Sequence, residues 1–118
     1  MAKLVVSYPS DAGTHFDAVY HVEKHLPLVE EKWAAYGLTG TTALLPDQPD
    51  PAHLAIAILS FDTRAGIDAA LASPEASEVF GDLPNFTDIA PQPAFFREGS
   101  RRSDRAVEGC GSKSVLPD

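Results

Sequence analysis

Two histidines and a tyrosine near the start of the chain have side chains suited to acid–base chemistry. Tyr20, His21 and His25 lie within one short stretch of sequence. An unperturbed imidazole titrates at about pH 6.5, so His25 could donate or accept a proton close to neutral pH. The hydroxyl of Tyr20 could orient a polar group of a ligand. The residue types alone leave two interpretations open, namely an acid–base role for His25 with Tyr20 orienting a ligand, or structural burial of both side chains.

The spacing of His21 and His25 also permits a metal site, because residues four apart lie on one face of a helix. A metal site needs a third ligand, and the sequence indicates none. A lone histidine is not a haem signature, and the chain has no glycine-rich nucleotide motif and no Gly-x-Ser-x-Gly nucleophile. Cys110 lies between two glycines, away from any group that would activate its thiol. We therefore expect no metal ion and no cofactor.

A helical repeat carries the histidines. Apolar residues recur at spacings of three and four, which predicts one buried helix face. The apolar positions are Val19, Val22, Leu26, Val29, Trp33 and Tyr36. Thr14 is the predicted N-cap, supported by Asp17, and Gly37 ends the helix. Pro27 lies inside the repeat, so we expect either a kink or two helical pieces, the second of which Pro27 opens.

Four stretches rich in β-branched and aromatic residues predict strands. They are residues 3–8, 38–45, 54–61 and a last strand within 86–96. Pro91 and Pro93 indicate a sheet edge or a bulge for the last strand, because proline cannot donate to a strand ladder.

Two helices are expected between the third and fourth strands. Asp62 or Thr63 caps the first, which ends near residue 72. Ser73 is the predicted N-cap of the second, which ends near Gly81. The resulting β-α-β-β-α-β order predicts an α+β, ferredoxin-like protomer whose four-stranded antiparallel sheet has its helices on one face.

The third predicted strand has a consequence for assembly. Residues 54–59 are apolar at every position, a pattern typical of a strand that is covered on both faces. The helices can cover one face only, so we predict a homodimer formed through the other sheet face. The alternative cover is the tail, residues 98–118, although its glycine, serine and charged content makes it a poor one.

Residues 16–29 resemble the signature of the EthD family. The matching features are an aromatic-Asp-x-x-Tyr start at Phe16–Tyr20, the histidine at His25, and Pro27 followed by Leu28. The surrounding element order resembles the dimeric α+β barrel superfamily that contains EthD. The resemblance gives an EthD-like domain over residues 1–97, whereas the tail from Gly99 onward has no recognised counterpart.

The resemblance implies a small-molecule cavity between the helices and the sheet. It also implies that His25, which matches the family histidine, is the catalytic acid–base residue and that Tyr20, the second motif residue, orients the ligand. The residues expected to line the cavity are Phe16, Val29, Trp33, Phe61, Phe80 and Phe86. It further implies a small-molecule-binding protein of catabolic or secondary metabolism. Such a protein is either a cofactor-free enzyme of acid–base or oxygenase type acting on a small hydrophobic compound, or a non-catalytic accessory, carrier or dimerisation module of a degradation pathway.

Charge and hydropathy exclude two classes of partner. The chain of 118 residues has a net charge of −8 and the length of one domain. Residues 1–96 contain four basic and thirteen acidic side chains, which would repel a phosphate backbone, so we expect no nucleic-acid binding. No apolar run approaches the roughly 20 residues of a membrane span, and the N-terminus does not resemble a signal peptide. We therefore expect a cytoplasmic protein without a membrane partner.

Overall fold

Every strand of the sheet runs antiparallel to its neighbours, in the order β2-β3-β1-β4. A computed structural model describes residues 2–10 and 15–100 of the chain. The strands are β1 (Ala2–Pro9), β2 (Leu38–Leu44), β3 (His53–Phe61) and β4 (Gln92–Arg97). The α-helices are α1 (Ala18–Tyr20), α2 (Leu26–Trp33), α3 (Arg64–Leu71) and α4 (Ala76–Gly81). A π-helix, η1 (His21–His25), joins α1 to α2, and η2 (Ala34–Tyr36) and η3 (Leu83–Asn85) are short 3-10 helices.

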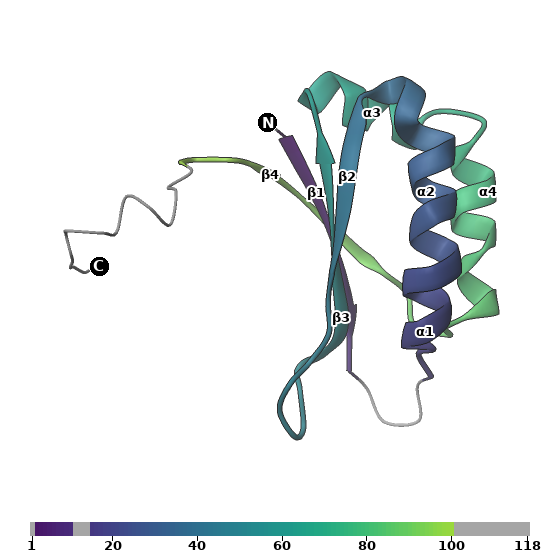
Figure 1. Cartoon of the computed structure of the whole chain (residues 1–118), viewed down its shortest axis with the longest axis vertical. Coiled ribbons are helices and arrows are strands. Elements are labelled where there is room, and N and C mark those ends of the chain that lie inside the picture. The colour runs from purple at the N-terminus through teal and green to yellow at the C-terminus, as the bar shows by residue number, and fades with distance from the viewer. Residues whose placement is uncertain (1, 11–14, 101–118) are drawn as a thin grey trace.

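The helices cover one face of the sheet. Figure 1 shows α2 and α4 side by side on that face, and α3 contacts β1 and β3. The predicted α+β, ferredoxin-like fold is therefore confirmed, and β4 lies at a sheet edge as its prolines indicated. Among the described residues, no element covers the opposite face (Figure 1). Nor does that part of the chain contain a helix with the length and apolar character needed to cross a membrane.

The first helical segment is divided near Pro27, as the sequence predicts. Asp17 caps α1, and its carboxylate accepts a hydrogen bond from the backbone N–H of Tyr20 at 3.1 Å. The predicted cap Thr14 lies outside the described residues. Pro27, in the first turn of α2, has no N–H to donate, and the turn before it widens into η1. Gly37 ends the segment in the left-handed conformation, at φ 94°.

The helices after β3 follow the predicted order with one difference. Thr63 caps α3, because its hydroxyl accepts a hydrogen bond from the N–H of Gly66 at 3.0 Å. The expectation that Ser73 caps the next helix is wrong. Its hydroxyl instead donates to the carbonyl of Ala70 at 2.6 Å and closes the end of α3. Helix α4 begins three residues later, with Glu75 in the capping position.

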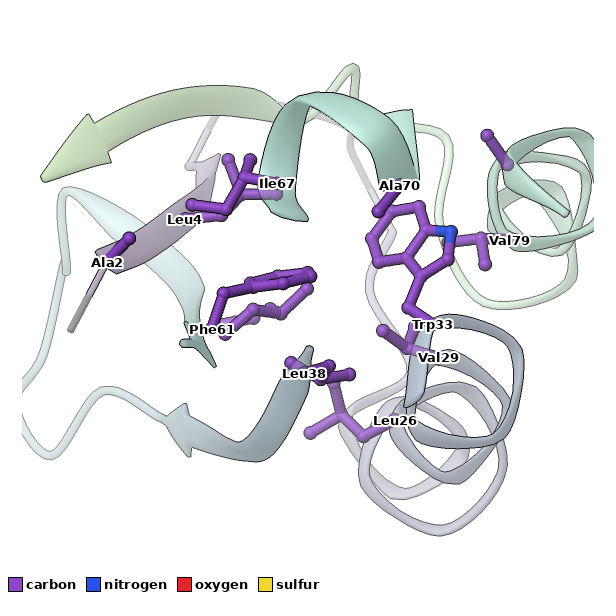
Figure 2. Close-up of a cluster of buried hydrophobic side chains, with 13 residues drawn as sticks. Ala2, Leu4, Leu26, Val29, Trp33, Leu38, Phe61, Ile67, Ala70 and Val79 are labelled. Atoms are coloured by element: carbon purple, nitrogen blue, oxygen red, sulfur yellow. The ribbon is translucent and has the colours of Figure 1, made fainter. Parts of the chain in front are cut away.

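Side chains of β3 alternate between the two faces of the sheet. Those under the helices are buried, namely Ala55, Ala57, Leu59 and Phe61. Those on the opposite face are only partly buried and include Ile56 and Ile58. Figure 2 shows the covered side, where Phe61 of β3 lies among side chains that include Leu38 and Leu4, with Trp33 of α2 beyond it. The ring centroids of Phe61 and Trp33 are 6.3 Å apart.

Candidate functional site

A cavity of about 170 Å³ lies between the helices and the covered face of the sheet. Its wall is almost entirely apolar and comes from β1, β3 and the helices above them. On the sheet side, Leu4 and Ala57 border it, and Phe80 and Pro93 are lining residues that also reach the molecular surface. The volume is close to the roughly 150 Å³ that admits one benzene molecule in a protein core.

His25 is the polar side chain in the cavity wall that has a charged partner. Its Nδ1 lies 2.9 Å from an oxygen of Asp82, the residue that follows α4. The other oxygen of Asp82 accepts hydrogen bonds from the hydroxyl of Tyr20 and from the side-chain amide of Asn85, each at 2.8 Å. An ionised carboxylate can only accept, so Nδ1 of His25 carries the proton and Nε2 is left as the basic nitrogen.

The protonation of this group follows from burial and hydrogen bonding. Burial lowers the pKa of His25, and the carboxylate of Asp82 offsets only part of that shift. Burial raises the pKa of Asp82, but the hydrogen bonds that it accepts outweigh burial and leave that pKa below its ordinary value. At neutral pH the site therefore contains a neutral imidazole held by a charged carboxylate. The hydrogen bond to Asp82 is the first cause of the raised pKa of Tyr20, which keeps its hydroxyl a donor.

His21 lies in an aromatic cluster beside His25. It is 0% exposed, and its ring stacks on that of His25 with centroids 5.8 Å apart. The rings of Tyr8, Phe16 and Phe86 surround it at 5.2–5.6 Å. Burial, followed by the nearby His25, lowers the pKa of His21 to about 4, so the ring is neutral at pH 7. Neither of its nitrogens has a hydrogen-bond partner among the described residues, although His21 lines the cavity.

The cavity wall contains one further unpartnered polar atom. Trp33 is 1% exposed, and its indole nitrogen has no acceptor within the described part of the chain. Figure 2 shows the nitrogen edge of the ring facing Val79 of α4. His21, His25, Val29 and Trp33 follow one another at intervals of four residues and all line the cavity. The imidazoles and the indole are thus at opposite ends of the same helical stripe.

Half of the predicted lining residues border the cavity. Val29, Trp33 and Phe80 do, as does the predicted catalytic residue His25. Tyr20 is not among the lining residues, and its hydroxyl binds Asp82.

The other three predicted lining residues pack behind the wall. Phe86 is 0% exposed and contacts the ring of His25, with centroids 4.7 Å apart. Phe16 packs on Tyr8 at a centroid separation of 5.0 Å. Phe61 is buried in the core next to Trp33. These rings hold the lining side chains in place and do not border the cavity themselves.

Asp82 is the site residue that sequence reasoning missed. It is 57 positions from His25 and 62 from Tyr20. Its one sequence signal is an acidic residue directly after the predicted end of a short helix at Gly81. Across residues 2–10 and 15–100, no group of three His, Cys, Asp or Glu side chains is arranged to hold a metal ion.

The fold and the cavity define the chain as a ferredoxin-like α+β protein with a pocket between helices and sheet. No protein-family model matches it, and no curated protein sequence is significantly similar to it. Among solved structures, an EthD-like protein from Ralstonia eutropha JMP134 is 29% identical with a TM-score of 0.76, covering 88% of this chain and 96% of that one. The predicted resemblance is thereby confirmed, because the chain is similar in sequence and in fold to an EthD-like protein.

Two more distant structures share the fold. An EthD family protein from Bacillus halodurans C-125 is 16% identical, with a TM-score of 0.64, and the match covers 83% of this chain and 98% of that one. A dimeric ferredoxin-like protein of unknown function from Jannaschia sp. CCS1 is 15% identical, with a TM-score of 0.58 and coverage of 82% and 98%.

Proposed function

We propose that the chain is an EthD-like protein that binds a small hydrophobic compound in the cavity, and that His25 acts on that compound as an acid–base residue without a cofactor. The observation that carries this proposal is the His25–Asp82 pair at the cavity wall, with 2.9 Å between the bonded atoms. A buried imidazole held by a carboxylate in an apolar pocket is suited to taking a proton from a bound molecule.

Each group near His25 has a defined part in this reaction. Nε2 of His25 accepts the proton, and the carboxylate of Asp82 stabilises the imidazolium that forms. Tyr20 is a positioning residue, because its hydroxyl fixes Asp82 and does not reach the cavity wall. Isomerisation, cyclisation and cofactor-free oxygenation can all begin with loss of a proton from the substrate, so the pair fits each of these reaction types.

The size of the cavity limits the ligand. At about 170 Å³ it admits one ring with a short substituent at most. Val29, Trp33 and Phe80 supply the apolar contacts on the helix side. The placement of such a compound in a degradation pathway follows from the sequence resemblance, and the cytoplasmic location follows from the N-terminal and hydropathy patterns; both stay predictions.

A carrier or accessory role is the second candidate, and the apolar character of the wall favours it. Such a wall binds a hydrophobic compound whether or not a reaction follows. A dimerisation module without a ligand is disfavoured, because its core would gain contacts by filling the cavity.

We also propose a homodimer formed through the bare face of the sheet, with residues 1–97 as the EthD-like domain and 98–118 as a tail. That face carries Val5, Ile56 and Ile58, which are only partly buried in the single chain. The Jannaschia structure described as dimeric supports this proposal.

Exchange of the α-hydrogens of cyclohexanone for deuterium tests the acid–base role, since it needs only a bound ring ketone and a base. We expect the wild-type protein to accelerate exchange at least about 100-fold over His25→Gln, which keeps a hydrogen-bonding side chain next to Asp82. The exposed His15 provides the control His15→Gln, expected to match the wild type. Binding of cyclohexanone without exchange would favour the carrier role. No binding of any small ring compound would overturn the ligand-binding proposal itself.

A further inference from the structure

His21 is a fully buried polar side chain that the proposed reaction does not use. It is 0% exposed, and neither ring nitrogen has a partner among the described residues. Buried polar groups in folded proteins are nearly always hydrogen-bonded, because an unpaired donor or acceptor loses its water without compensation. A neutral imidazole has one donor and one acceptor, and here both are unpaired.

Packing alone does not explain a histidine at this position. The rings around it are those of Tyr8, Phe16 and Phe86. A phenylalanine would fill an aromatic cluster of this kind without two unpaired nitrogens. The histidine therefore costs stability that a structural role would not require.

The position of His21 places its ring beside the proposed ligand site. It borders the cavity one helical turn before His25, and the two imidazoles stack with centroids 5.8 Å apart. Both belong to the π-helix η1, a distortion often found at functional sites. A molecule close to Nε2 of His25 would also lie close to the ring of His21.

We propose that His21 anchors the ligand, by hydrogen-bonding a hydroxyl group on an uncharged ring compound that occupies the cavity beside His25. This inference rests on the proposed ligand-binding function and adds the chemical class of the ligand. A hydroxyl both donates and accepts, so it can pair with either the protonated or the unprotonated nitrogen of a neutral imidazole. An anionic ligand is disfavoured by the nearby carboxylate of Asp82 and by the net charge of −8. An apolar wall would not compensate the desolvation of a cation.

The test compares phenol with toluene, which fill similar volumes and differ in the hydroxyl. The full-length protein is titrated with each compound by calorimetry. We expect the wild-type protein to bind phenol about tenfold more tightly than toluene, the effect of one net hydrogen bond. His21→Phe should bind toluene as the wild type does and lose the preference for phenol. His21→Gln, which keeps a donor and an acceptor, should retain part of it, and the exposed-site control His15→Phe should retain all of it. Benzoate should bind more weakly than phenol.

The outcomes separate the two proposals. Equal affinity of the wild type for phenol and toluene, or an unchanged preference in His21→Phe, overturns the role of His21 and leaves the cavity as a binding site. If His21→Phe does not fold, loss of all phenol preference in a folded His21→Gln overturns it, since that side chain keeps both polar groups. Failure of phenol and toluene alike to bind the wild-type protein overturns the ligand-binding function and, with it, this inference.

Discussion

Asp82 determines what the imidazole of His25 can do. The carboxylate fixes the ring through Nδ1, and it is itself fixed by Tyr20 and Asn85. The motif at residues 16–29 contains the histidine and the tyrosine, and both were predicted as site residues from sequence. Their common partner could not be predicted, because a contact across 57 positions depends on how α4 packs against η1 and not on any local pattern.

Replacing Asp82 with asparagine tests the electrostatic part of the pair. The amide oxygen can still accept from Nδ1, so we expect the fold to be kept. Loss of the negative charge should lower the pKa of His25 further, because in the wild-type protein the carboxylate of Asp82 raises that pKa. Deuterium exchange of bound cyclohexanone should fall by about 10- to 100-fold at neutral pH. An NMR titration of the His25 ring proton measures the pKa, and an unchanged pKa and exchange rate in Asp82→Asn would contradict the assigned role.

His21 should make the fold sensitive to acid. Its pKa is about 4 in the folded protein against an ordinary 6.5, so the unfolded chain binds a proton at higher pH than the folded one. The free energy of unfolding should therefore fall as the pH drops from about 6.5 to about 4, by up to roughly 3 kcal/mol. Burial shifts the pKa of His25 in the same direction. The low pKa of Asp82 confines its own effect to more acidic conditions.

Urea unfolding at about pH 7 and about pH 4.5 measures this effect. The wild-type protein should lose more stability between the two conditions than His21→Phe, which lacks the titrating ring but keeps His25 and Asp82. Equal losses in the two proteins would show that His21 is not held neutral by burial.

At the level of elements, the sequence predicted best what depends on neighbouring residues. Pro27 and Gly37 mark the division and the end of the first helical segment, because a missing N–H and a left-handed backbone act locally. The prediction that Ser73 caps the next helix was wrong, because a serine hydroxyl can close the preceding helix as readily as it can cap the next one. The π-helix η1 was not predicted, because a helix can accommodate a proline either by a kink or by a widened turn.

The alanines of β3 are a second case that sequence could not decide. Ala55 and Ala57 are both buried on the helix side of the sheet, where a small side chain either permits close packing or leaves a hollow. Ala57 borders the ligand cavity, whereas Ala55 packs in the cluster that contains Tyr8 and Phe86.

Leucine at each of these positions should therefore give opposite results. Ala57→Leu places its added atoms in empty space, so we expect little change in stability and loss of phenol and toluene binding. Ala55→Leu overpacks a filled cluster and should cost about 1–3 kcal/mol. Thermal unfolding and calorimetric titration of both variants check this prediction, and it fails if Ala57→Leu still binds both compounds as the wild type does.

At the scale of the whole molecule, the bare face of the sheet is a surface that no element of the described residues covers (Figure 1). Its centre is formed where Val5 of β1 pairs with Ile58 of β3, which in turn pairs with Thr42 of β2. Leu44 and Phe96, from the two outer strands, are 49% and 55% exposed. A stable homodimer buries roughly 1,200–2,000 Å² in total, and an open antiparallel sheet face that carries exposed and partly buried apolar side chains provides the type of surface that such an interface uses.

We therefore expect a dimer at micromolar concentration in sedimentation equilibrium. Ile58→Asp sets two like charges against each other across the centre of a symmetric interface and leaves each without a partner, so it should give monomers. Val22→Asp adds the same charge on the exposed side of the helical layer, where Val22 is 42% exposed, and should leave the dimer intact. Removal of residues 101–118 distinguishes the two candidate covers of this face, which are a second copy of the chain and the tail. A dimer formed through the sheet face persists without those residues. A wild-type protein that is monomeric at that concentration would contradict the homodimer. The apolar pattern of residues 54–59 would then require an intramolecular cover, for which the tail is the candidate.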